Sequence, residues 1–277
     1  MVSMNTKKRL SLYLIIGLCL VVIVGYGMSK KEGDSQNIHF DLRLENVAYR
    51  VMLEEHRLYV ENTSSHEKKK LLEDLFIDMV IYDINGDGKE ELLLLTLNQE
   101  KQGIEGKKFG RELQFYELIV EDKVLMPKLM YTNNIASVQP FMLRVGRLQE
   151  KETSVFVGVY KKTRYYEEII NRPFFFSWNG LFIERKWTGS YLSHNELIDL
   201  VFVDLTGDGL DEIAVLEETS RGAYQVSLYK WLNFGFDYLT TSKKKDMPLG
   251  SLKVTMEKGK AKIKIVYEDG REEDVTF

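Results

Sequence analysis

Short apolar runs separated by polar, glycine-containing turns recur along most of the chain. Two such runs, Phe76–Tyr82 and Leu92–Leu97, flank one polar stretch, and two others, Leu197–Val203 and Ile213–Leu216, flank a second. Apolar runs of this length that are bounded by Gly and Asp are typical of buried β-strands. The pattern therefore predicts a strand, a polar loop and a second strand at both places.

The two polar loops share one sequence pattern, D-x-[NT]-G-D-G-x-x-E, at residues 83–91 and 204–212. Oxygen-bearing side chains stand at positions 1, 3, 5 and 9 of the pattern, and the glycines between them permit the positive φ angles of a tightly curled loop. Calcium takes about six to eight oxygen ligands in proteins. We therefore predict two structural calcium sites. The candidate ligands, with a backbone carbonyl at position 7, are Asp83, Asn85, Asp87, Lys89 and Glu91 in the first loop and Asp204, Thr206, Asp208, Leu210 and Glu212 in the second.

Two other interpretations of the loops are weaker. An EF-hand places its loop between helices and has a bidentate Glu at position 12, where this chain has Leu94 and Val215. Asn-Gly and Asp-Gly pairs also form hairpin turns without a metal. Because both copies keep the same ligand positions and the same strand context, we favour cation loops.

A degenerate third copy lies between the two loops. Without gaps, residues 145–157 align with 203–215, and the apolar positions coincide. Gly146, Leu148 and Ser154 replace three of the four ligand side chains, so no metal is expected here. The copies are spaced by 63 (146 − 83) and 58 (204 − 146) residues. This spacing predicts a repeat of about 60 residues, with units near 76–130, 138–190 and 197–245.

Downstream of each loop position, an aromatic strand runs into a polar turn and another apolar strand, so each unit is expected to hold four strands. We interpret Trp178, Trp187 and Trp231 as core residues, with a carbohydrate or peptide surface as the alternative. Residues 252–267 predict a C-terminal hairpin with one solvated face. Residues 67–75 resemble a helix, with Ser65 as its cap.

The loop pattern, its flanking strands and the aromatic hairpin resemble the FG-GAP and VCBS-type repeats of integrin-α-like β-propellers. The resemblance implies that each loop joins two strands of a blade and binds calcium. The FG and GAP tripeptides are absent, and Thr206 replaces the usual Asp or Asn at position 3, which is expected to weaken the second site. The implied fold class is all-β, a small or incomplete β-propeller of about four four-stranded blades, preceded by an N-terminal transmembrane helix.

The N-terminus has the pattern of a membrane anchor. A basic segment at 1–9 precedes an uncharged, mostly apolar stretch at 10–28, whose length is near the roughly 20 residues needed to span a bilayer. The basic end is expected to stay in the cytoplasm, so 29–37 becomes a tether and 38–277 an extracytoplasmic domain. We favour a retained single-pass signal anchor.

Two other outcomes would put the same domain on the same side of the membrane. One is cleavage near Gly25 and Gly27, and the other is lipidation at Cys19, where Leu18 occupies a position that needs a small residue. Cys19 is the only cysteine, so the exported domain holds no disulfide.

The net charge and the absence of common catalytic motifs reduce the number of functional classes that fit this sequence. The net charge of −4 includes +3 from residues 1–9, which leaves −7 for the rest, and an acidic domain is a poor partner for nucleic acid. The chain has no G-x-S-x-G or H-E-x-x-H motif, and the pairs Glu167-Glu168 and Glu217-Glu218 are interpreted as solvated. We expect a membrane-anchored, calcium-stabilised binding module without catalytic activity, whose ligand is a protein or a glycan. The alternatives are a cell-envelope hydrolase and an accessory subunit of an envelope complex.

Overall fold

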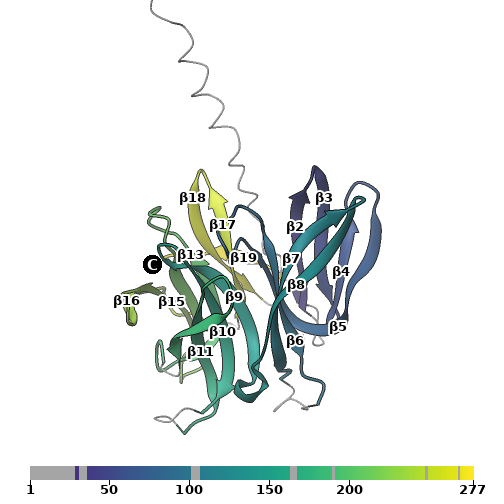
Figure 1. The fold of residues 1–277 in the computed structure, drawn as a ribbon. Coiled ribbons are helices and arrows are strands. Elements are labelled where there is room, and N and C mark those ends of the chain that lie inside the picture. Colours follow the sequence, from purple (N-terminus) through teal and green to yellow (C-terminus); the bar gives the residue numbers. More distant parts are fainter. Residues whose placement is uncertain are drawn as a thin grey trace, which may run out of the picture.

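The protein is described by a computed structural model that covers residues 29–30, 36–100, 107–162, 167–188, 191–246, 249–267 and 269–277. These residues form antiparallel β-sheets (Figure 1), which confirms the all-β class. The predicted cytoplasmic segment 1–9 and anchor 10–28 lie outside the described residues. In the described part of the chain, no helix is long and apolar enough to cross a membrane.

The first sheet has eight strands in chain order. Its strands are β1 (Ser29–Lys30), β2 (Gln36–Leu44), β3 (Val47–Glu54), β4 (Arg57–Asn62), β5 (Glu67–Tyr82), β6 (Glu91–Leu97), β7 (Gly110–Glu121) and β8 (Val124–Asn134). The ends of the segment predicted as a tether thus form β1 and the start of β2. Strand β5 serves two neighbours, because Glu67–Lys70 pair with β4 and Phe76–Tyr82 pair with β6. The sheet therefore divides at β5 into an N-terminal layer, β2–β4, and a second layer, β5–β8.

The helix predicted for residues 67–75 was wrong, because these residues belong to β5. Their Glu, Lys and Leu side chains favour a helix in isolation, but propensity is a weak preference that tertiary pairing overrides. Here the backbone of 67–70 completes the ladder of β4, and Leu71 and Leu72 pack against the core between the first two layers.

Three further sheets complete the molecule. One contains β9 (Pro140–Gln149), β10 (Glu152–Lys161), β11 (Ile170–Trp178) and β12 (Ile183–Thr188), and a second contains β13 (Glu196–Val203), β14 (Glu212–Glu218), β15 (Tyr224–Trp231) and β16 (Phe236–Thr241). The last contains β17 (Leu249–Glu257), β18 (Lys260–Tyr267) and β19 (Glu272–Asp274), which confirms the C-terminal hairpin. A short 3₁₀ turn, Ala136–Val138, connects β8 to β9.

Four hydrophobic clusters hold the layers together in chain order. The first joins β2–β4 to β5–β8, and the others join β5–β8 to β9–β12, β9–β12 to β13–β16, and β13–β16 to β17–β19. Leu92 and Leu94 face the first cluster, whereas Leu93 and Leu95 face the second. A strand buried on both faces needs a continuous apolar run, which accounts for the four consecutive leucines.

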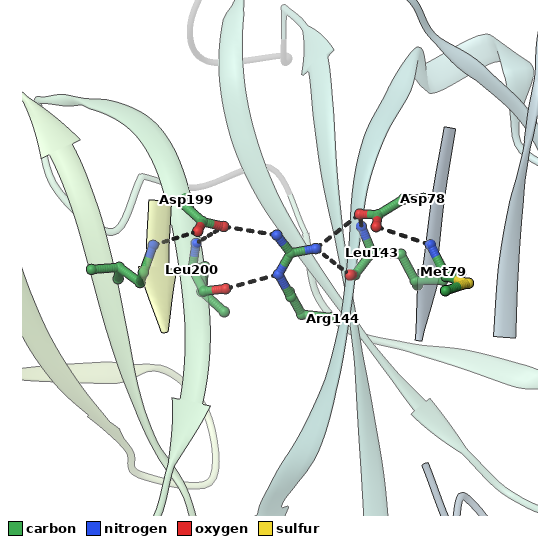
Figure 2. Close-up of polar contacts among 7 residues, drawn as sticks. Asp78, Met79, Leu143, Arg144, Asp199 and Leu200 are labelled. Atoms are coloured by element: carbon green, nitrogen blue, oxygen red, sulfur yellow. Dashed lines mark hydrogen bonds and ion pairs between the residues drawn. The ribbon is translucent and has the colours of Figure 1, made fainter. Parts of the chain in front are cut away.

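A buried polar bridge links the first strands of three adjacent layers (Figure 2). The Arg144 guanidinium on β9 lies 2.8 Å from Asp78 Oδ2 on β5 and 2.9 Å from Asp199 Oδ1 on β13. Its Nε also donates to the carbonyl of Leu200. Both carboxylate side chains are only 4% exposed. Isolated buried charges are very costly, and pairing with hydrogen bonds is what makes them tolerable.

Each of the two aspartates also fastens its own layer to the next one. Asp78 Oδ2 accepts a hydrogen bond from the backbone N–H of Leu143 on β9, and Asp199 Oδ2 accepts one from Leu252 N on β17, both at 2.8 Å. The other oxygen of each carboxylate accepts the N–H of the residue that follows it in its own strand. Burial raises the pKa of Asp78, and the charge of Arg144 opposes that shift. The bridge and these bonds together form a continuous polar connection from β5 to β17.

Candidate metal centre

The first predicted cation loop connects β5 to β6 and is shaped by its own first residue. The Asp83 carboxylate accepts hydrogen bonds of 2.8–3.1 Å from three backbone N–H groups, those of Gly86, Asp87 and Gly88. Gly86 and Gly88 have φ angles of +75° and +84°, although a Cβ would meet nothing within 4 Å at either position. These glycines are therefore required for backbone conformation and not for space. The result is a curled loop whose N–H groups point at one carboxylate.

The remaining side chains of the first loop turn toward the same loop. Asn85 Oδ1 accepts the N–H of Asp87, and Asp87 Oδ1 accepts that of Lys89. Glu91, which is 2% exposed, accepts hydrogen bonds from Ile84 N at 2.9 Å and Asn85 Nδ2 at 3.1 Å.

Glu91 lies in an environment that disfavours its charge. Burial raises the pKa of Glu91 to about 7, with the carboxylates of Asp87, Asp83 and Glu117 acting in the same direction and the hydrogen bond from Ile84 N opposing them. A bound cation would reverse this preference by favouring the ionised form.

The second loop, between β13 and β14, repeats the geometry of the first. The Asp204 carboxylate accepts hydrogen bonds of 2.6–3.2 Å from three backbone N–H groups, those of Gly207, Asp208 and Gly209. Gly207 and Gly209 have φ angles of +75° and +82°. Asp208 Oδ1 accepts the N–H of Leu210, as Asp87 does for Lys89. The shared sequence pattern thus produces the same local fold twice.

Glu212 distinguishes the second loop from the first. Its residue is 1% exposed, its Oε2 accepts the N–H of Leu205, and its Oε1 is buried without a hydrogen-bond partner. Oε1 forms an ion pair with the Lys230 ammonium at 3.5 Å, and this ammonium also donates a hydrogen bond to Asp208 Oδ2 at 3.3 Å. A buried carboxylate oxygen without a hydrogen bond is unfavourable, so this position suits a positive charge.

The donor chemistry of both loops fits a hard cation, since every predicted ligand atom is an oxygen. Among the described residues, no three His, Cys, Asp or Glu side chains are grouped closely enough to hold a metal by themselves. A cation in either loop would therefore also need the oxygens of Asn85 or Thr206 and the carbonyl of Lys89 or Leu210. In the second loop, the Oγ1 atom of Thr206 lies 3.5 Å from the Oδ1 atom of Asp204, so these two predicted ligand atoms are close to each other.

The degenerate middle copy has a tight turn in place of a cation loop. Strands β9 and β10 continue until Gln149 pairs with Glu152, so only Glu150 and Lys151 lie between them. Gly146, which aligns with Asp204, is in contact with β13: a Cβ there would lie 2.2 Å from Phe202 Cγ. The alignment of residues 145–157 with 203–215 indicated the loss of the ligands. The contact between Gly146 and Phe202 depends on how the two layers pack and could not be read from that alignment.

A cleft of about 500 Å³, whose lining is polar and apolar in nearly equal parts, lies beside the first loop. It is lined by Ile84–Gly86, Arg147, Lys151–Thr153 and Trp178–Gly180. One wall is thus the acidic loop, and the others come from the turn of the middle unit and the β11–β12 hairpin. The backbone of Arg147 also bonds to Asp211 of the second loop: its N–H donates to Asp211 Oδ2 at 2.6 Å, and its carbonyl accepts the N–H of Asp211 at 2.7 Å.

The structure confirms the burial predicted for the three tryptophans but not the exposure predicted for Glu217. Trp178 and Trp231 are buried in the clusters between layers, and Trp187 packs against the same cluster as Trp231, so the core interpretation of these tryptophans is confirmed. Glu217, interpreted as solvated, is 1% exposed, and that prediction was wrong.

Glu217 can be buried because neutral hydrogen-bond donors from separate segments of the chain surround its carboxylate. Its carboxylate accepts hydrogen bonds from the side chains of Ser193, Asn195, Gln225, Ser227 and Tyr229. Two of these precede β13 and three lie on β15, so only the folded sheet gathers them. Such donors satisfy a buried carboxylate without a counter-charge.

Comparison with known proteins gives only distant similarities. No protein-family model and no curated protein sequence matches the chain. It is similar in structure to a rhamnogalacturonan lyase from Bacillus licheniformis, with a TM-score of 0.39 and 11% identity over 90% of this chain and 59% of that one. It is also similar to TolB from Acinetobacter baumannii, with a TM-score of 0.40 and 14% identity over 91% of this chain and 63% of that one. The chain therefore spans less than two thirds of the length of either protein.

Proposed function

We propose that this protein is a membrane-anchored, extracytoplasmic binding module without catalytic activity, stabilised by calcium in its two acidic loops. Its sheets would form an incomplete β-propeller whose blades are β5–β8, β9–β12, β13–β16 and β17–β19. The succession of layers joined by one hydrophobic cluster each supports this arrangement. So does the resemblance of the two loops to FG-GAP and VCBS-type repeats.

The observation that carries the calcium proposal is the buried Glu212 Oε1, which accepts no hydrogen bond and has the Lys230 ammonium as an ion-pair partner 3.5 Å away. In the first loop, the ligands would be the side chains of Asp83, Asn85, Asp87 and Glu91 and the carbonyl of Lys89. In the second, they would be those of Asp204, Thr206, Asp208 and Glu212 and the carbonyl of Leu210. Bound calcium would neutralise the carboxylates of each loop and fix the strand pair on either side of it. With about three carboxylates a site, affinity is expected in the weak range of extracellular modules, on the order of 10⁻⁴–10⁻³ M.

Calcium in the first loop would also fix one wall of the neighbouring cleft, because Ile84, Asn85 and Gly86 line it. We propose that this cleft contributes to the surface that meets a protein or glycan ligand. Its lining carries mixed charge, from Arg147, Lys151 and Glu152, which suits a ligand with polar groups.

The test is thermal unfolding of the full chain, purified in mild detergent, at millimolar calcium and in chelator. Calcium is expected to raise the unfolding midpoint by several degrees, because a ligand that binds only the folded state stabilises it. Asp87→Ala and Asp208→Ala are each expected to remove part of the shift. Glu150→Ala, in the turn of the middle unit, is the control and should leave it unchanged. A midpoint that moves by less than about 1 °C in the parent protein would contradict the proposal.

A further inference from the structure

The two loops differ most in the residue that faces position 9 from the neighbouring strand. In the first loop, Glu91 on β6 is paired across the sheet with Glu117 on β7. In the second, the register pairs Ile213 with Tyr229, and one more step along it brings Glu212 opposite Lys230 on β15. Glu117 and Lys230 therefore occupy equivalent positions in the two units but carry opposite charges.

The Lys230 ammonium lies between two predicted ligands of the second loop. It is 3.3 Å from Asp208 Oδ2, at position 5, and 3.5 Å from Glu212 Oε1, at position 9. Glu212 Oε1 is the buried oxygen that accepts no hydrogen bond. The ammonium is thus close to the place from which a divalent cation would contact the same two carboxylates.

The first loop has the opposite arrangement. Glu117 adds a carboxylate near Glu91, and its own ion pair is with Lys128 on β8, 3.2 Å away at the exposed side. Counting every charged residue of each nine-residue loop, the first loop with Glu117 carries −3 − 1 = −4, whereas the second loop with Lys230 carries −4 + 1 = −3. A nearby like charge disfavours a bound cation, and a nearby opposite charge favours it.

We propose that Lys230 is the resident counter-cation of the second loop, so that the first loop is the stronger calcium site and the second binds calcium only when the ammonium moves away. This inference rests on the proposed calcium binding and assigns a different role to each loop. The first loop depends on a divalent ion to neutralise its carboxylates. The second is held by an ion pair when calcium is scarce.

The test exchanges charge at the two equivalent positions in the full-length protein in detergent, with calcium chloride titrated in a calorimeter. The parent protein is expected to show two calcium-binding events, one stronger and one weaker. Asp87→Ala is expected to remove the stronger event. Lys230→Gln is expected to strengthen the weaker event by about tenfold or more, because a positive charge a few ångströms from the ion is removed. Glu117→Lys is expected to weaken the stronger event by a similar factor.

A second measurement, thermal unfolding in chelator, requires no calcium binding. Lys230→Gln should lower the midpoint, because Glu212 loses its counter-charge, and Glu117→Gln should raise it, because a repulsion is removed. Shifts of about 2–4 °C correspond to 1 kcal/mol in a domain of this size. This readout also reports whether each variant folds.

The outcomes separate the two proposals. If calcium events occur but Lys230→Gln changes neither the weaker event nor the midpoint in chelator, the role of Lys230 is refuted while calcium binding stands. If Asp87→Ala removes the weaker event and leaves the stronger one, the assignment of the loops is reversed and the inference fails. If neither the parent nor any variant binds calcium, both proposals fail.

Discussion

Replacing Arg144 by methionine is expected to be the most damaging single change in the core. The substitution keeps an apolar stem of similar length but removes the cation that lies between Asp78 and Asp199. Breaking a buried ion pair by removing one partner costs about 3–5 kcal/mol, because the remaining charge is left uncompensated. Here one cation serves two carboxylates, so the upper end of that range is expected. A folded domain has a total stability of only about 5–15 kcal/mol.

The geometry limits the loss to this range. Each aspartate keeps two backbone N–H donors after Arg144 is removed, one from its own strand and one from the next layer. What disappears is the charge compensation, the hydrogen bonds to the two carboxylates and those to the carbonyls of Leu143 and Leu200. Arg144→Lys keeps the charge but cannot reach both carboxylates with a planar fork, so its loss should be intermediate.

The assay is urea unfolding in chelator, followed by tryptophan fluorescence, with the slope of free energy against urea checked for constancy. Asp78→Ala introduced into the Arg144→Met background should recover part of the loss, since one uncompensated carboxylate is removed. The matched single variant Asp78→Ala alone should be destabilised. A folded Arg144→Met protein within about 1 kcal/mol of the parent would refute the role given to the bridge.

Two other predictions concern the predicted metal loops and the unit between them. Gly146→Ala should destabilise the protein by about 1–3 kcal/mol in the same urea assay, because its Cβ would overlap the Phe202 ring. The control is Gly235→Ala, since a Cβ at Gly235 meets nothing within 4 Å. Equal losses of stability in the two variants would contradict the packing argument. In chelator, stability should fall as pH rises from about 4.5 to about 7. The reason is that folding raises the pKa of Glu91 to about 7, so the folded state holds a proton that the unfolded chain releases. Glu91→Gln should flatten this part of the pH profile of the unfolding midpoint, and an unchanged profile would refute the assignment of this pH dependence to Glu91.

The strands around the loops were predictable because their signal is local. An apolar run, a glycine-hinged acidic turn and another apolar run occur within about 20 residues, and the periodicity rules operate on that scale. The local fold of the loops followed for the same reason, since Asp83 and Asp204 bind N–H groups three to five residues further on.

The polar bridge was not predicted, although one of its signals was present. Asp78 and Asp199 each stand five residues before their loop, inside runs that are otherwise apolar (83 − 78 = 5 and 204 − 199 = 5). A charge repeated at the same place in two buried strands indicates a buried role. Arg144 had no such signal, because the partner of a buried charge is set by which strands become neighbours. Glu217 was misjudged for the same reason.

The order in which the layers pack has a consequence for how the chain acquires its structure. Each hydrophobic cluster joins two layers that are consecutive in sequence, and the bonds to Leu143 and Leu252 also point from one layer to the next. A nascent chain emerges N-terminus first, and domains commonly fold in that direction during synthesis. Every layer after the first therefore finds its docking partner already in place, and the first has to wait only for the layer that follows it in the sequence.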